Sequence, residues 1–158
     1  MSQVSYNEID MTGLGGRILA LDFGKRRIGL AVSDELGITA QGLPTLQRTN
    51  KAQDLDALDQ LIRERGVALV VMGQPLHMSG TEGRQANYAA QFARTLEAHA
   101  QVEVRMWDER LTTVEANRVL KQSGVSRQKQ RAAVDRLSAV LILQSYLDYL
   151  AGQAAAGV

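Results

Sequence analysis

Among the acidic residues of the sequence, those at three separate places could take part in catalysis: Asp22, the adjacent pair Asp108 and Glu109, and Asp135. The chain contains no cysteine and two histidines, so carboxylates are the natural ligands for any bound metal. Three oxygen ligands from separate elements suit Mg²⁺ or Mn²⁺, which activates a water and stabilises charge on the attacking and leaving oxygens of a phosphodiester. The pattern predicts a metal-dependent nuclease that needs neither a histidine base nor a serine nucleophile.

Asp22 lies near the end of the first apolar segment, on the same side as Ile18 and Ala20 if the side chains of a strand alternate strictly. Burying an ionised carboxylate among such neighbours costs roughly several kcal/mol unless a cation or hydrogen-bond donors compensate. This cost favours a metal ligand. The alternative is a salt bridge to one of the basic residues of the following turn, which are Lys25, Arg26 and Arg27.

Asp108 and Glu109 follow the fifth predicted strand, where parallel sheets commonly place functional side chains. Alternation puts the two side chains on opposite sides of that strand. At most one of them is therefore expected to share a pocket with Asp22, unless the strand has already ended. The residues by themselves leave the choice open.

Asp135 lies within a long predicted helix, on a face that it shares with Ser138, Ala139 and Ile142. Small residues on this face let the helix approach a sheet closely. For Asp135 taken alone, the more common arrangement is a solvated position beside Arg136. Only the other two acidic positions favour a role in a shared site.

The segment from Arg110 to Arg136 carries seven basic residues against two acidic ones, Glu115 and Asp135. Its middle, residues 122–130, is polar and is predicted to be flexible, so it could close over a phosphate backbone. A solvated loop with no ligand would have the same composition, and Thr112 or Thr113 is also explained as a helix N-cap. The residues that we assign to substrate binding are Lys25, Arg26, Arg110, Thr112, Arg127, Lys129 and Arg131.

Hydrophobic periodicity predicts the elements that must position these side chains. Three strands that can pair as antiparallel neighbours are followed by two strands reached through helical crossovers, which predicts a mixed five-stranded α/β sheet with helices on both faces. Gly66 is predicted to end the first helix. The expected strands are 17–23, 28–33, one within 38–46, 67–72 and 102–107, and the expected helices are 53–65, one marked by apolar residues from 86 to 96, 113–121 and 132–150.

The totals match one domain of ordinary size: 158 residues, 45% hydrophobic and 22% charged, with a formal net charge of +1. We expect a flexible leader at 1–16, a folded domain at 17–151 and a frayed tail at 152–158. No apolar run reaches the length of a membrane span, and the start lacks the features of a secretory signal, so we expect a cytoplasmic protein.

Four ordered motifs resemble the YqgF/RuvX family. The first covers 19–34, the second is Gly73-Gln74-Pro75 with residues 78–81, the third covers 108–116, and the fourth combines 134–135, 138–139 and 142–144. The resemblance runs from about Arg17 to Leu150. It implies a ribonuclease-H-like fold with Asp22, Glu109 and Asp135 as the metal-binding carboxylates.

The resemblance also implies a role in maturing the 5′ end of the small-subunit ribosomal RNA precursor, with Holliday junction resolution as the alternative. Two features depart from the related patterns. Gln74 stands where the family often has leucine, and the fourth predicted strand supplies no acid at its end, where resolvases and ribonucleases H usually carry one. The second carboxylate must then come from the neighbouring strand, about 4.8 Å farther along the sheet.

Four functions therefore compete. The first is an RNA nuclease, and the second is a nuclease for branched or single-stranded DNA. The third is nucleotide binding, since the hairpin turn that starts at Asp22 also resembles the phosphate-binding turn of actin-like ATPases. The fourth is a noncatalytic RNA-binding module. In each case the expected partner is a nucleotide or nucleic acid, and the protein is expected to act as a monomer or homodimer without a membrane.

Overall fold

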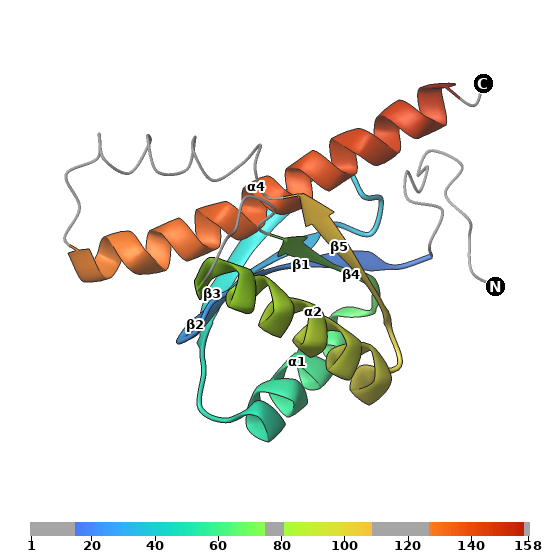
Figure 1. Ribbon diagram of the computed structural model, residues 1–158. Helices are drawn as coiled ribbons and strands as arrows, with labels where there is room; N and C mark the ends of the chain where they lie inside the picture. Colours follow the sequence, from blue (N-terminus) through green and yellow to red (C-terminus); the bar gives the residue numbers. More distant parts are fainter. Residues whose placement is uncertain (1–14, 75–80, 109–126, 157–158) are drawn as a thin grey trace.

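The computed structural model describes residues 15–74, 81–108 and 127–156, without the side chains of 81–82, 85–86 and 127–135. The predicted helix at 113–121 lies outside these residues. The described elements are β1 (Arg17–Phe23), β2 (Arg27–Ser33), β3 (Ala40–Gln47), α1 (Lys51–Arg65), β4 (Val67–Gln74), α2 (Thr81–Ala100), β5 (Glu103–Asp108) and α4 (Arg127–Ala156), as Figure 1 shows.

The strands form one five-stranded sheet in the order β3-β2-β1-β4-β5. The β1–β2 and β2–β3 pairs are antiparallel, whereas β4 and β5 continue the sheet parallel to β1. This confirms the predicted mixed sheet of three antiparallel strands followed by two parallel ones. Because β1, β4 and β5 run in the same direction, their carboxyl ends meet at one edge of the sheet.

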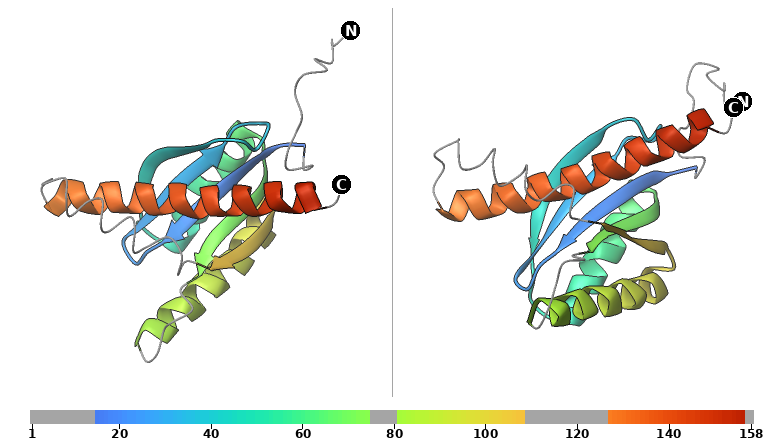
Figure 2. Two further views of the ribbon diagram at one scale, coloured as in Figure 1. Left: turned by 90° about the horizontal axis from the view of Figure 1, so that it is seen from above. Right: turned by 45° about the horizontal axis from the view of Figure 1, so that its top comes forward.

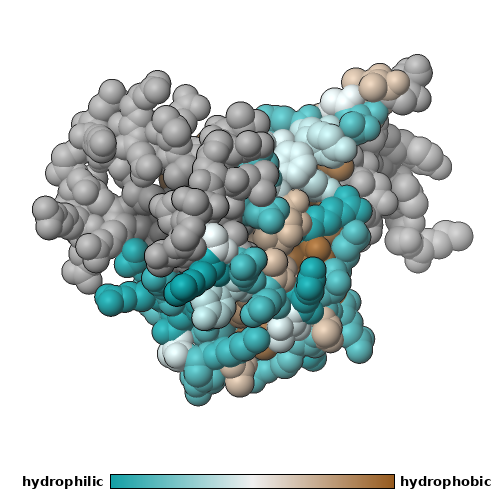
Figure 3. Space-filling model, viewed as in Figure 1, coloured by the Kyte–Doolittle hydropathy of each residue, from teal (hydrophilic) through white to brown (hydrophobic). Residues whose placement is uncertain are grey.

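Helices cover both faces, as predicted: among the described helices, α4 crosses one face, and α1 and α2 lie together against the other (Figures 1 and 2). Alternation along β1 divides its apolar residues between two cores. Ile18 and Ala20 belong to the core under α4, and Leu19 and Leu21 belong to the core under α1 and α2. With apolar residues gathered inside, the described part of the face seen in Figure 3 is mostly hydrophilic and shows apolar residues in small patches.

Helix α1 has a defined cap at each end. The side chain of Asn50 accepts a hydrogen bond from the Gln53 amide at 2.9 Å, which satisfies a donor left free by the first turn. Gly66 adopts the left-handed conformation with φ 62°, which confirms that it ends the helix. The N-cap places the start at Lys51, two residues before the predicted start.

Helix α4 is longer than predicted at both ends. It begins at Arg127, so residues 127–130, which we expected to be flexible, are helical. It continues to Ala156, so most of the predicted frayed tail is helical as well. Both extensions consist mainly of arginine, glutamine, lysine and alanine, which have high helix propensity. Among the described helices, none is long and apolar enough to cross a membrane.

Close packing of α4 depends on small residues in the sheet. A Cβ added to Gly42 on β3 would lie 2.6 Å from the Cγ of Arg136 and 3.3 Å from the Cγ2 of Val140. On the helix, Ser138 and Ala139 are buried against the same face. This confirms the expectation that small residues let the helix approach the sheet.

Candidate metal and nucleic-acid site

Asp22 is the sixth residue of β1 and is half-buried. The strand alternation places it on the α4 face of the sheet, together with the fully buried Ile18 and Ala20. On β2 it faces Gly29, which has no side chain to cover that flank of the carboxylate. Asp22 and Arg27 both have interaction partners, so the alternative of an ion pair at this turn stays open.

The register of the parallel strands defines what lies beside Asp22. Leu21 is level with Met72 on β4, which places Asp22 next to Gly73, and Gly73 is level with Trp107 on β5. The residues from Val67 to Gln74 include no acid. A second carboxylate from the parallel strands on this side of Asp22 must therefore come from β5 or the residues after it, two strand spacings from Asp22, or about 10 Å across the sheet.

The side chains of β5 establish which of its residues face α4. The Trp107 Nε1 donates a hydrogen bond to Ser145 Oγ at 3.1 Å, and the Arg105 guanidinium donates to Tyr146 Oη at 2.6 Å. Both partners belong to α4. A hydrogen bond to Glu103 is the main reason that the pKa of Arg105 is raised above its ordinary value, so this arginine stays charged.

Alternation then places Asp108 on the face opposite Asp22. Val104 and Met106, four and two residues before it, pack against the core under α1 and α2. Asp108 is the last residue of β5, level with Gln74, and has an interaction partner. The next position, Glu109, lies outside the described residues, and so do Arg110 and Thr112.

Asp135 occupies a position in the body of α4. It precedes the buried pair Ser138 and Ala139 by one helical turn, so its position lies on the stripe of the helix that faces the sheet. Its side chain is outside the described part. The same holds for the side chains of Arg127, Lys129 and Arg131, whose positions form the first turns of α4.

The structure therefore describes one carboxylate of the predicted triad and the backbone position of another. Among the described side chains, no three acidic or histidine groups form a metal site. Glu109 and the carboxylate of Asp135 are not among them. The assignment of all three residues to one metal remains a prediction.

The turn after Asp22 carries Lys25 and Arg26, and both side chains are exposed. The Gly24 amide donates to the Arg27 carbonyl oxygen at 2.9 Å, and a Cβ on Gly24 would lie 2.6 Å from that oxygen. Glycine is therefore required at this position of the turn. The two cations follow Asp22 by three and four residues, in the turn beyond the carboxyl end of β1.

Sequence reasoning missed Arg48, which holds this turn in place. The guanidinium donates to the carbonyl oxygens of Gly24 at 3.0 Å and Lys25 at 3.4 Å, and to the Asp54 carboxylate at 3.1 Å. It also lies over the ring of Phe23, with 4.6 Å between the guanidinium carbon and the ring centroid. No motif marks Arg48, because these partners come from two separate segments, residues 23–25 and α1.

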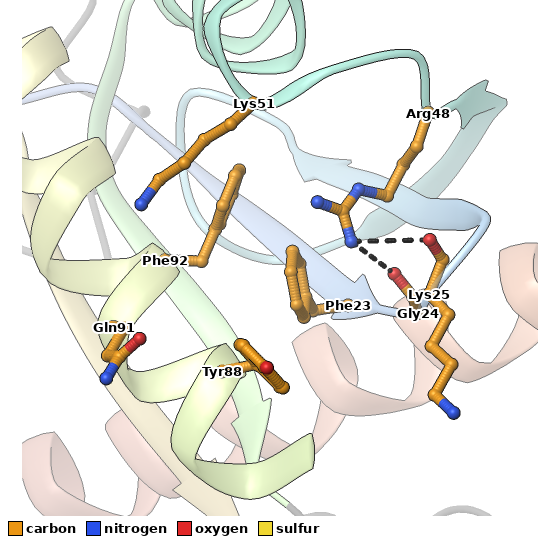
Figure 4. Close-up of a pocket in the computed structure, with 8 residues that line it drawn as sticks. All are labelled: Phe23, Gly24, Lys25, Arg48, Lys51, Tyr88, Gln91 and Phe92. Atoms are coloured by element: carbon orange, nitrogen blue, oxygen red, sulfur yellow. Dashed lines mark hydrogen bonds between the residues drawn. The ribbon is translucent and has the colours of Figure 1, made fainter. Parts of the chain in front are cut away.

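Sequence reasoning also missed a pocket beside this turn, with a volume of about 300 Å³ (Figure 4). It opens beyond the carboxyl end of β1 on the side of α1 and α2. Its walls combine aromatic rings and cations: Phe23, Lys25, Arg48, Lys51, Tyr88 and Phe92. Two residues of its wall carried a sequence signal: Phe23, which directly follows Asp22 in the first motif, and Lys25, which was assigned to substrate binding.

Solved structures with a similar arrangement support the fold. Thermus thermophilus RuvC in complex with a Holliday junction substrate superposes with a TM-score of 0.52 over 82% of this chain and 96% of that chain, at 10% sequence identity. The fowlpox virus resolvase with Holliday junction DNA gives a TM-score of 0.54 over 85% and 98%, at 12% identity. These likenesses confirm the predicted ribonuclease-H-like fold.

Curated relatives are much closer in sequence. A protein of Koribacter versatilis (strain Ellin345) named "Putative pre-16S rRNA nuclease" is 58% identical over 133 residues, which are 84% of this chain and 87% of that protein. A protein of the same name from Shouchella clausii (strain KSM-K16) is 51% identical over 134 residues, 84% of this chain and 94% of that protein. A family model described as "RuvX: Holliday junction resolvase" matches residues 16–149. These matches confirm the resemblance inferred from the four motifs: the chain belongs to the RuvX family.

Proposed function

We propose that this protein is a divalent-metal-dependent nuclease that hydrolyses phosphodiester bonds in RNA and matures the 5′ end of the 16S ribosomal RNA precursor. The observation that carries this proposal is Asp22, a half-buried carboxylate at the carboxyl end of β1 on the face that α4 crosses, with position 135 on the facing stripe of that helix. The names of the curated relatives support the choice of RNA. Such a role implies a cytoplasmic protein that acts as a monomer or homodimer.

The residues suit Mg²⁺ or Mn²⁺ because the candidate ligands, Asp22, Glu109 and Asp135, are all carboxylates, the donors that hard cations prefer. The residue that pairs with Asp22 on β2 is Gly29, which has no side chain to compete for this position. A bound cation would lower the pKa of a coordinated water and stabilise negative charge on the reacting phosphate. The role of the three acids is to hold the cation at the sheet edge.

The cations near Asp22 would hold the substrate. Lys25 and Arg26 extend from a turn whose backbone is held by hydrogen bonds from Gly24 and Arg48, so only their side chains need to be ordered when they bind backbone phosphates. The first turns of α4 add Arg127, Lys129 and Arg131, and the preceding segment adds Arg110 and Thr112. Contacts to phosphates give affinity without sequence preference.

A test compares cleavage of a 16S precursor fragment by the wild-type protein and by Asp22→Asn in Mn²⁺. We expect the variant to lose cleavage and to bind the RNA with nearly unchanged affinity, because the amide is a weaker metal ligand of the same shape. Asp56→Asn is the matched control, since Asp56 is exposed on α1 and pairs with His99. Equal cleavage by Asp22→Asn and the wild-type protein would refute the proposal.

A second candidate function is cleavage of branched DNA. The description of the family model and the two resolvase structures favour it. Matched RNA, single-stranded DNA and a four-way DNA junction should be offered to the same enzyme preparation. Symmetric nicks confined to the junction would select this function over the RNA nuclease and would require a dimer, whereas cleavage confined to RNA would reject it.

A further inference from the structure

The pocket beside the β1–β2 turn presents aromatic rings from two elements. Phe23 ends β1 and Phe92 belongs to α2, and their ring centroids lie 4.6 Å apart at an interplanar angle of 30°. Phe92 is buried and fixed in the core, but Tyr88, one turn earlier on α2, is 66% exposed. In Figure 4 the Tyr88 ring lies at the pocket near Phe23. A large exposed ring beside a fixed aromatic pair provides a stacking surface for a planar group.

Cationic side chains also line this pocket. Lys51 reaches toward it from the first residue of α1, and Lys25 comes from the turn, although its ammonium group points away from the rings (Figure 4). Neither lysine forms an ion pair with the described residues, and no acidic side chain lines the pocket there. Asp54, the acid that pairs with Arg48 of the pocket wall, is buried and already bound by that arginine. An anionic group would therefore be attracted.

Rings and cations in one cavity match the two parts of a nucleotide. A base can stack on an aromatic side chain and use its edge for hydrogen bonds, for which the exposed amide of Gln91 is available. The phosphate can contact Lys51. A volume of about 300 Å³ is at the lower end of the range for small-ligand sites, so one nucleotide unit fits rather than several.

The pocket is also next to the proposed catalytic edge. Phe23 and Asp22 are consecutive residues, so their Cα atoms lie about 3.8 Å apart, and their side chains point to opposite faces of the sheet. A nucleic-acid strand that passes the end of β1 can thus present a phosphate to Asp22 and a neighbouring base to the pocket. A base paired in a duplex cannot enter without leaving its stack.

We infer that this pocket binds one unpaired nucleotide of the substrate strand, with its base against Tyr88 and its phosphate at Lys51. The inference rests on the proposed nuclease function and specifies its substrate as single-stranded near the cleavage point. It assigns Tyr88 and Lys51 as binding residues, which neither the motifs nor the predicted site contained.

The test measures fluorescence anisotropy of a labelled single-stranded RNA with the full chain, in EDTA so that no cleavage occurs. Base stacking on an aromatic side chain predicts about tenfold weaker binding for Tyr88→Ala and wild-type affinity for Tyr88→Phe, which keeps the ring. Lys51→Gln should also weaken binding and flatten its salt dependence. The same RNA sequence in duplex form should bind Tyr88→Ala and the wild-type protein with equal affinity.

Matched controls separate the pocket from general effects. Tyr149→Ala removes an exposed tyrosine from α4, and Arg65→Gln removes one positive charge from the opposite end of α1, so both should bind single-stranded RNA like the wild-type protein. A competing mononucleotide, AMP, should displace RNA from the wild-type protein more effectively than from Tyr88→Ala. Melting temperatures identify any variant that has lost its fold.

Unchanged single-strand binding by a folded Tyr88→Ala would overturn the inference, and so would an equal loss of duplex binding. The proposed nuclease function fails on a different measurement, the Mn²⁺-dependent cleavage that Asp22→Asn should abolish. Loss of binding in Tyr88→Ala therefore supports the pocket even if cleavage is absent. Retained binding rejects the pocket even if cleavage is present.

Discussion

The two faces of the sheet are built from different side chains. Under α4 the central positions are small, with Ala20 on β1, Ala31 on β2 and Ala139 on the helix, so one long helix lies close to the strands. On the opposite face the same two strands carry larger side chains, Leu21 and Leu30, which pack under α1 and α2. Close approach of a helix suits a site made of short carboxylates, whereas a deeper layer with rings at its rim leaves a pocket.

The end of β1 joins these two environments. Asp22 faces α4, and Phe23 packs against Phe92 on the other side, so one strand end supplies the proposed metal ligand and a wall of the proposed nucleotide pocket. A strand can do this because its side chains alternate between faces at each residue. Catalysis and recognition of the nucleic-acid strand can thus be divided between the two faces at one edge of the sheet. Three further predictions test this division.

The largest expected effect concerns the two adjacent acids after β5. If the metal lies on the α4 face, Glu109→Gln should reduce cleavage by at least about 100-fold, since even the groups that orient metal ligands contribute 10–100-fold. Asp108→Asn should keep most of the activity, because alternation in β5 puts Asp108 on the other face. Cleavage rates at saturating Mn²⁺ measure both. A larger loss of cleavage in Asp108→Asn than in Glu109→Gln would show that the alternation of side chains breaks at the end of β5.

A smaller effect is expected at Arg48, on the side of α1 and α2. Arg48→Met keeps the packing on Phe23 but removes the hydrogen bonds to Gly24, Lys25 and the buried Asp54. Hydrogen bonds to charged groups contribute about 1.5–3 kcal/mol, so urea unfolding should show a loss of that size.

The exposed Arg94, on α2, provides the control for Arg48. Arg94→Met should unfold at the same urea concentration as the wild-type protein. If Arg48→Met does so too, Arg48 is not what holds the turn against α1.

The smallest expected effects compare a substitution in the sheet under α4 with a substitution in α4 itself. Gly42→Ala should lower the free energy of unfolding by about 1 kcal/mol, because its Cβ meets Arg136 at 2.6 Å. Gly152 lies in α4 itself, with nothing within 4 Å of an added Cβ. Gly152→Ala should therefore raise the free energy of unfolding by at most about 1 kcal/mol through helix propensity. Melting curves that shift in the same direction would show that α4 adjusts its distance from the sheet.

Local patterns in the sequence predicted most of the fold. The apolar run from Val67 to Met72 identified a central strand, and Gly66 identified the end of α1, because burial on both faces and left-handed backbone each restrict the residue type strongly. The ends of α4 were wrong by several residues. Residues 127–130 are polar and carry no hydrophobic period, so helix propensity decided what the pattern could not indicate.

The candidate site divides in the same way. Asp22 was identifiable because a carboxylate in an apolar strand is costly, and the family motifs added Glu109 and Asp135. Arg48, Lys51 and Tyr88 were not identifiable, because a polar residue in a loop or on a helix surface is the ordinary case. They form a site only together, and their positions in the sequence do not indicate that they meet.

The sequence alone determined the order of strands and helices, the family and the candidate carboxylates, since these follow from local periodicity and from motifs of neighbouring residues. Only the tertiary structure decided that Asp108 and Asp22 lie on opposite faces and that a cationic aromatic pocket adjoins the end of β1. The physical reason is that register and helix packing are collective. They depend on how whole strands and helices pack together, which the spacing of residues within one segment does not specify.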